Sequence, residues 1–401
     1  MNYDKNTDFE DFTGGFTGGF SAGTGNSTED FGTSPHWSDY SPEDHTRAKK
    51  KFSRFFLSLF VYLIVANVVA IAIQVGSILL LGAEEAAKLS AGPYFVWIVQ
   101  VLSMYVIAFP AFYLINHGMK SVIRTKGKMK ITDLLVTFLI AEGLMVVGSI
   151  VSNILTSVFT MFFGYELNNN TSDIIMSSPI WLIILVAVII GPIVEELMFR
   201  KLLMDKLGAY GDRICIIVSA VSFGIFHGNL FQVFYAAMLG ALLAYVYSKT
   251  GNVIYTIILH IAINFFGSVL PMLIMEPAER LLELSEQVTS GAEVDYAEYL
   301  RLTMIVGSYS MVQYGLAIAG IVLLISKLRN RQLFVSDRCE VLIPKERRAS
   351  VIVGNVGAIL FLVIIGLTFI TSLMPDLSAI VPEGSGEAIL KGLRLLIGGN
   401  E

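Results

Sequence analysis

Long apolar stretches separated by short polar segments fill most of the chain after residue 45. Several of these stretches have roughly 20 or more apolar residues, enough to cross a hydrocarbon core of about 30 Å as a helix. We therefore expect an all-α polytopic membrane protein, a bundle of about nine transmembrane helices. The predicted spans lie at about 55–81, 94–115, 133–163, 179–203, 213–229, 231–248, 252–275, 302–326 and 353–374.

The composition agrees with this fold class, since 54% of the residues are hydrophobic and only 15% are charged. The spans divide into N-terminal helices at 55–163, a helical core at 179–275 and C-terminal helices at 302–374. The chain has only two cysteines, Cys215 and Cys339, and no CxxC spacing. This excludes a disulfide framework.

Three segments lie outside the spans. Residues 1–45 are rich in Gly, Ser, Thr and Asp and contain the repeat FTGGFTGGF, which predicts a disordered low-complexity tail. Residues 276–300 carry seven acidic side chains against Arg280 alone. Their spacing predicts an acidic loop with a short amphipathic helix on the membrane surface. Residues 375–401 are expected to form a second tail.

The charge of the connecting segments predicts how the chain is oriented in the membrane. Basic segments at 47–54, 120–130, 200–213 and 327–348 alternate with acidic or uncharged connections. Because positively charged loops stay on the cytoplasmic side, we expect a multi-pass protein of the cell membrane with a cytoplasmic N-terminus. The loop at 276–300 and the C-terminus are then extracytoplasmic. Nine spans satisfy this alternation, whereas eight would not.

Few ionisable side chains lie inside the predicted spans. Each costs several kcal/mol at membrane depth, so each is a candidate functional residue. The third span contains Glu142, and the fourth ends with a charged cluster. The charged cluster of the fourth span consists of Glu195, Glu196 and Arg200. The fifth span contains His227, and the seventh contains His260 and the polar Asn264.

Helical spacing assigns different environments to the two adjacent glutamates. Glu196 and Arg200 stand at i and i+4 on one helix face and can form an ion pair. Glu195 points about 100° away and can face a cavity and move protons. The simpler interpretation is a charge cluster at the membrane interface. Glutamates at a helix C-terminus oppose the macrodipole, however, so their placement there needs compensation.

The two histidines of the spans share helix faces with other residues at i and i+4, His260 with Asn264 and His227 with Phe223. A carboxylate, two imidazoles and an amide that converge between helices are the parts of a hydrolytic site. The carboxylate can activate water as a base, and imidazole and amide N–H groups can stabilise an oxyanion.

Three segments, EELMFR (195–200), FGIFH (223–227) and HIAIN (260–264), resemble the EExxxR, FxxxH and HxxxN motifs of the CPBP family. This family comprises intramembrane endopeptidases related to type II CAAX prenyl proteases and to bacteriocin-processing and immunity (Abi) proteins. The motifs occur in the family's order and on successive spans. The resemblance covers about residues 180–270.

The resemblance implies an intramembrane endopeptidase in which Glu195 activates the attacking water with help from His227. It implies further that Glu196 pairs with Arg200, and that His260 and Asn264 stabilise the oxyanion. We expect no cofactor. The alternative is a zinc ion held by Glu195, His227 and His260, although the HExxH spacing of zinc peptidases is absent from the sequence. Glu142 has no counterpart in the motifs.

The expected partners are the lipid bilayer and a peptide or lipidated protein that enters from the membrane, with no nucleic acid. Two other functions are compatible with the same residues. One is a proton-coupled transporter, although no second copy of the EExxxR segment is present. The other is a catalytically silent immunity or scaffold protein of the same family.

Straight helices do not bring the candidate residues to one depth. If the fourth span ends near Arg200, Glu195 lies about 8 Å from that end. His227 lies about 21 Å along the fifth span from Arg213, and His260 about 13 Å above Gly251. We therefore expect tilted helices around a water-filled cavity, or a fifth helix that begins outside the bilayer core.

Overall fold

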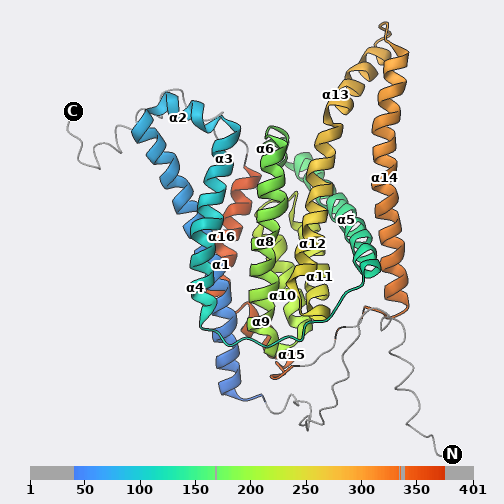
Figure 1. Ribbon diagram of the computed structural model, residues 1–401. Helices are drawn as coiled ribbons and strands as arrows, with labels where there is room; N and C mark the ends of the chain where they lie inside the picture. Colours follow the sequence, from blue (N-terminus) through green and yellow to red (C-terminus); the bar gives the residue numbers. More distant parts are fainter. Residues whose placement is uncertain (1–39, 168, 334, 336–338, 375–401) are drawn as a thin grey trace, which may run out of the picture.

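The computed structural model describes residues 40–374 except 168, 334 and 336–338, and all regular elements within them are helices (Figure 1). Within these residues, eight helices are long and apolar enough to cross a membrane. The predicted 213–229 span corresponds to α10 (Asp212–Phe226), which has 15 residues and is too short to count among these eight. The predicted polytopic all-α fold is confirmed.

The N-terminal part of the bundle contains one long helix, a short surface helix, a helix with a central π segment and a second long helix. These are α1 (Pro42–Leu81), α2 (Ala83–Ser90), α3 (Pro93–Gln100), η3 (Val101–Ala108), α4 (Phe109–His117) and α5 (Ile131–Phe163).

The core begins with the short α6 (Asn170–Met176), which is followed by one continuous helix with two π segments. That helix consists of α7 (Ile180–Leu182), η4 (Ile183–Ile190), α8 (Gly191–Glu196), η5 (Leu197–Leu202), α9 (Leu203–Leu207) and the 3₁₀ turn η6 (Gly208–Tyr210). A hairpin of α10 and α11 (Val233–Thr250) comes next, and then α12 (Val253–Asn264).

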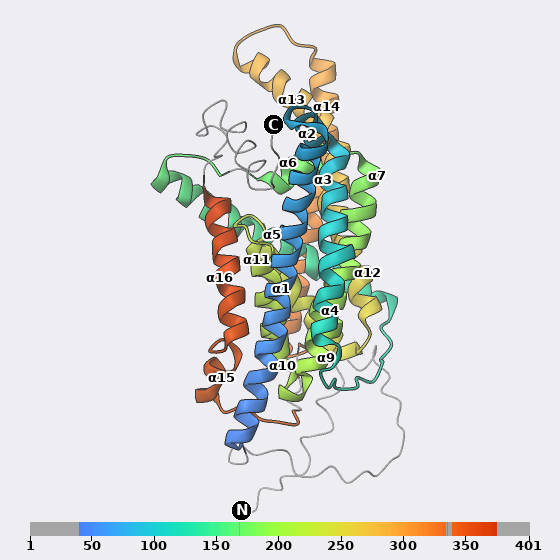
Figure 2. The same ribbon diagram turned by 90° about the vertical axis from the view of Figure 1, so that its left-hand side faces the viewer.

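The C-terminal part extends α12 and then adds two further spans. Its elements are η7 (Phe265–Val269), α13 (Leu270–Thr289), α14 (Tyr296–Arg329), α15 (Lys345–Ile352) and α16 (Val356–Leu373). The long helices run roughly parallel to one axis (Figures 1 and 2). The start of α1 and the end of α16 lie toward opposite ends of the bundle, while the assignment of these ends to the cytoplasm and the exterior stays a prediction.

Two expectations about the segments outside the spans need correction. Helix α1 begins at Pro42 instead of after residue 45, because Ser41 caps it and exchanges hydrogen bonds with Asp44. The rest of the predicted 1–45 tail and all of 375–401 fall outside the described residues.

The acidic segment 276–300 is not a loop with a helix on the surface. Helix α13 continues straight from α12 and η7, and only six residues, 290–295, separate it from α14. The two helices form a hairpin that rises above the rest of the bundle (Figure 1). Leu284 and Leu302 are buried, and Arg280 bonds Glu298 across the hairpin at 3.2 Å. The segment therefore packs on a helix of this chain.

The depth conflict between Glu195 and His227 disappears because the helix of the fourth span does not end near Arg200. The helix runs on to Tyr210 and turns directly into α10. Glu195 lies 15 residues before Tyr210, and His227 lies 15 residues after Asp212, which is about 22 Å on either side of the turn. Charges beyond Arg200 are bonded within the protein, as Lys206 is to the Met119 carbonyl at 2.6 Å.

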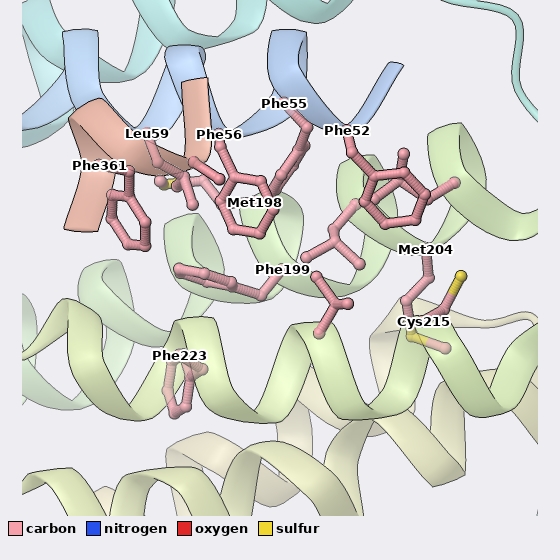
Figure 3. Close-up of a cluster of buried hydrophobic side chains, with 14 of the residues drawn as sticks. Phe52, Phe55, Phe56, Leu59, Met198, Phe199, Met204, Cys215, Phe223 and Phe361 are labelled. Carbon is pink, nitrogen blue, oxygen red and sulfur yellow. The ribbon is translucent and has the colours of Figure 1, made fainter. Parts of the chain in front are cut away.

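Small residues and aromatic rings hold the bundle together. Gly320 of α14 lies against the Leu139 carbonyl of α5, and Gly148 of α5 lies against the backbone of Tyr235. Such close approaches are typical of membrane helix packing. Figure 3 shows the main core, in which phenylalanines of α1 and α16 meet Phe199 and Phe223. The centroids of these two rings lie 5.3 Å apart, and the rings pack edge to face. Phe223 also contacts the rings of His227 and His260.

An extended segment at 118–130, here called the strap, crosses the lower end of the core (Figure 1). Its Arg124 lies 3.3 Å from Asp205 and 2.7 Å from Asp212. Tyr247 and Lys201 also bond Asp205, at 2.8 and 2.6 Å. Burial opposes the charge of Arg124, but Asp212 outweighs burial and raises the pKa of the guanidinium. We call these five residues the strap cluster. It joins the strap, η5, α9, α10 and α11.

Candidate active site

A cavity of about 670 Å³ lies between the helices and contains the candidate catalytic groups on its wall. One wall is a stripe of three residues spaced by four along the continuous helix, Ala187, Gly191 and Glu195. The first two are small, so the stripe leaves open space on the N-terminal side of Glu195. Helical side chains lean toward the helix N-terminus, which directs the Glu195 carboxylate toward this space.

Glu196 and Arg200 form the ion pair that the sequence predicted. Both are fully buried, and Arg200 Nε lies 3.1 Å from Glu196 Oε2, without hydrogen-bond geometry. The guanidinium also lies over the Phe223 ring at 4.5 Å, and its Nη2 donates to the Gly240 carbonyl at 3.5 Å. This pair is sealed in protein, and Arg200 is absent from the cavity wall.

His260 bridges the two glutamates. Its Nδ1 lies 2.9 Å from Glu196 Oε1, and its Nε2 lies 3.7 Å from Glu195 Oε2. A carboxylate only accepts hydrogen bonds, so Nδ1 carries a proton and Nε2 faces Glu195. The Glu195 side chain is 23% exposed, whereas that of Glu196 is fully buried. The neighbouring glutamates therefore differ in role: Glu196 orients the imidazole, and Glu195 is open to the cavity.

His227 stands at the end of α10, where the chain turns toward α11. Its Nδ1 lies 2.8 Å from the Phe223 carbonyl oxygen. A carbonyl only accepts hydrogen bonds, so Nδ1 is the donor, and Nε2 of the neutral ring keeps a lone pair. Phe223 packs edge to face against both His227 and His260. His227 and Glu195 line the same cavity, but no hydrogen bond or ion pair joins them in the described part of the chain.

Asn264 is anchored by a carbonyl that a proline leaves free. In the π segment η4, N–H groups bond five residues back, as Gly191 does to Val186. The next carbonyl, of Ala187, would require an N–H at position 192, but Pro192 has none. Asn264 Nδ2 donates to Ala187 at 2.9 Å instead. The amide keeps a second N–H for the cavity that it lines.

The alternative zinc site needs Glu195, His227 and His260 as ligands. Within residues 40–374 with the gaps stated above, no group of three His, Cys, Asp or Glu side chains is arranged to hold a metal ion. The three residues therefore do not fit a zinc site as they stand, and no catalytic step proposed below is assigned to a metal.

Glu142 does not belong to this cavity wall. It is buried between α5 and α14, where Gln313 Nε2 donates to its Oε2 at 3.2 Å, and Oε1 has no partner among the described residues. Sequence reasoning missed Tyr105 and Gln100, which line the cavity from the helix of α3 and η3. Both are uncharged and lie in an apolar span, so the search for ionisable groups passed over them.

Comparison with known proteins relates this core to membrane peptidases. Residues 177–266 match the family model described as "Type II CAAX prenyl endopeptidase Rce1-like". A stretch of 123 residues is 31% identical to "Putative membrane peptidase YdiL" of Bacillus subtilis (strain 168), which covers 30% of this chain and 48% of that protein. The chain thus spans about half the length of the curated relative it matches. No solved structure matches it.

Proposed function

With residues 177–266 as a domain of the type II CAAX prenyl endopeptidase Rce1-like family, we propose that this protein is an intramembrane endopeptidase that depends on Glu195. The observation that carries the proposal is the difference between the paired glutamates. Glu196 is buried against Arg200 and His260, whereas Glu195 is open to a cavity between the helices and lies 3.7 Å from an imidazole nitrogen.

The first chemical step is the attack of water on the scissile carbonyl. The Glu195 carboxylate removes one proton from a water molecule, and the oxygen of that water bonds to the carbonyl carbon. The electron pair of the C=O bond moves onto its oxygen. His227, whose Nε2 lone pair is available, accepts a hydrogen bond from the water and helps to orient it.

The oxyanion is stabilised by His260 and Asn264. The imidazole donates through an Nε2–H in its doubly protonated form, because its Nδ1–H is held by Glu196. The amide acts through its second N–H, because the first is bonded to Ala187. When the intermediate collapses, the C–N bond breaks and the proton taken by Glu195 passes to the leaving amine. A carboxylic acid and an amine are formed, and the acid then gives its proton to the amine, so that a carboxylate and an ammonium group are released.

The substrate is a peptide segment of a membrane-associated or lipidated protein that reaches the cavity between the helices. Helix ends and side chains of α6 and α10–α11 line the cavity as well as the catalytic stripe. Polar groups such as Asn153, Thr171 and Gln232 can bind a peptide backbone there.

The test is cleavage by the purified protein in nanodiscs. A library of membrane-anchored peptides is incubated with the wild type and with Glu195→Ala, His227→Ala and His260→Ala variants, and new peptide termini are identified by mass spectrometry. We expect cleavage by the wild type that persists after exhaustive chelation and is lost in Glu195→Ala. Equal cleavage by Glu195→Ala would contradict the proposal, and no cleavage by any form would favour a silent scaffold.

A further inference from the structure

The hydroxyl of Tyr105 lies against the stripe of Ala187, Gly191 and Glu195. A Cβ atom placed on Gly191 would lie 3.2 Å from the Tyr105 hydroxyl oxygen. The missing side chain at position 191 therefore lets this hydroxyl approach the helix one turn before Glu195. Both residues line the cavity.

The hydroxyl of Tyr105 is free to donate. It accepts a long bond from Gln100 Nε2 at 3.5 Å, and among the described residues it donates to no acceptor. The residue is held in η3, a π segment in the middle of its span. Such segments occur frequently at functional sites because they displace a side chain from its regular helical position.

Two donors thus flank the same strip of backbone from opposite sides. Asn264 approaches at Ala187 from α12, and Tyr105 approaches at Gly191 from η3. On the cavity face of this helix, Ala187 and Gly191 carry no side chain larger than a methyl group, and the next cavity-lining residue is Glu195. A peptide carbonyl that lies over this strip can receive a hydrogen bond from each side.

We infer that Tyr105 is a further catalytic residue, a hydrogen-bond donor to the oxyanion opposite Asn264, and that Gly191 is the glycine that admits its hydroxyl. This inference rests on the proposed peptidase function. It adds a donor from outside the three motifs and explains why the position four residues before the catalytic glutamate carries no side chain.

The experiment uses a fluorogenic, internally quenched peptide built on the sequence that the wild type cleaves fastest in the library. Tyr105→Phe keeps the ring and removes only the donor. We expect its kcat to fall about 100-fold, the size of effect seen when one oxyanion donor is lost. KM should change less than about threefold, because the donor acts mainly in the transition state. The control is Tyr113→Phe, an exposed tyrosine of α4, which should match the wild type.

Gly191→Ala tests the Tyr105 hydroxyl without a change to Tyr105 itself. The new Cβ should displace the hydroxyl and lower kcat about tenfold in the wild type, but change it little in the Tyr105→Phe background. Equal effects in both backgrounds, or an unchanged kcat in Tyr105→Phe, would overturn the inference. In these cases the wild type still cleaves the peptide, so the inference about Tyr105 would fail while the proposed peptidase function would stand. A wild type without activity contradicts the proposed function itself.

Discussion

The continuous helix from Ile180 to Tyr210 carries two buried charge clusters that differ in how completely they are paired. At the lower end, Asp205 of the strap cluster is bonded to Arg124, Lys201 and Tyr247. Ten residues earlier on the helix, Glu195 lies 3.7 Å from His260, its one ion-pair partner among the described residues. The Asp205 carboxylate is buried among these partners, whereas the Glu195 carboxylate lines a cavity.

This difference teaches that charge inside a membrane protein does not by itself locate chemistry. Buried charges with several partners stabilise a fold, and removal of one partner leaves the others uncompensated. A carboxylate with a distant partner and access to a cavity can instead exchange protons with water. The predictions below separate these two roles.

The largest effect on stability is expected for Arg200→Met. The fully buried Glu196 would lose its guanidinium partner and keep only His260, and breaking a buried ion pair costs about 3–5 kcal/mol. The free energy of unfolding can be measured by denaturant titration in mixed micelles. Addition of Glu196→Gln to the variant should recover most of the loss. A single variant as stable as the wild type would contradict the pairing.

A smaller loss is expected for Arg124→Met, which removes the cation between Asp205 and Asp212. Because these side chains are 7–20% exposed, water compensates part of the charge, and we expect about 2–3 kcal/mol. Activity per folded molecule should stay unchanged, which would distinguish this cluster from the catalytic one. Lys126→Met, an exposed change in the same strap, is the control. Lost activity in folded Arg124→Met would contradict the assignment of a purely structural role to the strap cluster.

Asn264→Ala should lower both stability and catalytic activity, because the Asn264 amide contributes to both. The Ala187 carbonyl loses its partner, which costs about 1–3 kcal/mol, and one oxyanion donor is lost. Pro192→Ala added to this variant supplies an N–H for the same carbonyl. The double variant should regain stability but not catalysis. Recovery of both would show that Asn264 acts only as an anchor.

The smallest effect is expected for Glu142→Gln. The amide keeps the bond to Gln313 and removes a carboxylate oxygen that has no partner in the described structure. Stability should change by less than about 1 kcal/mol, and cleavage should equal that of the wild type. Abolished cleavage would place Glu142 in the catalytic machinery.

The sequence predicted most of the fold because hydrophobic length decides which segments cross a membrane. It also predicted the Glu196–Arg200 pair, since that pair depends only on helical spacing. It misplaced the end of the fourth span, because the charges of Lys201 and Lys206 looked like an interface although they are bonded within the protein.

Other features were inaccessible to sequence reasoning. The role of Asn264 as an anchor depends on a π segment and on Pro192, and backbone hydrogen-bond register is not visible in residue types. Tyr105 reaches the site only because two helices meet at Gly191. Tertiary contacts of this kind carry no signal in local spacing.

The most direct test compares Glu195→Gln with Glu196→Gln, two isosteric changes at adjacent positions. Each variant is measured for unfolding free energy and for kcat on the same fluorogenic peptide. We expect Glu195→Gln to keep wild-type stability and lose about 10²–10⁴-fold in kcat, the contribution of a general base. Glu196→Gln should lose stability, because Arg200 is left without its counter-ion. Wild-type cleavage by a folded Glu195→Gln variant would contradict the central claim.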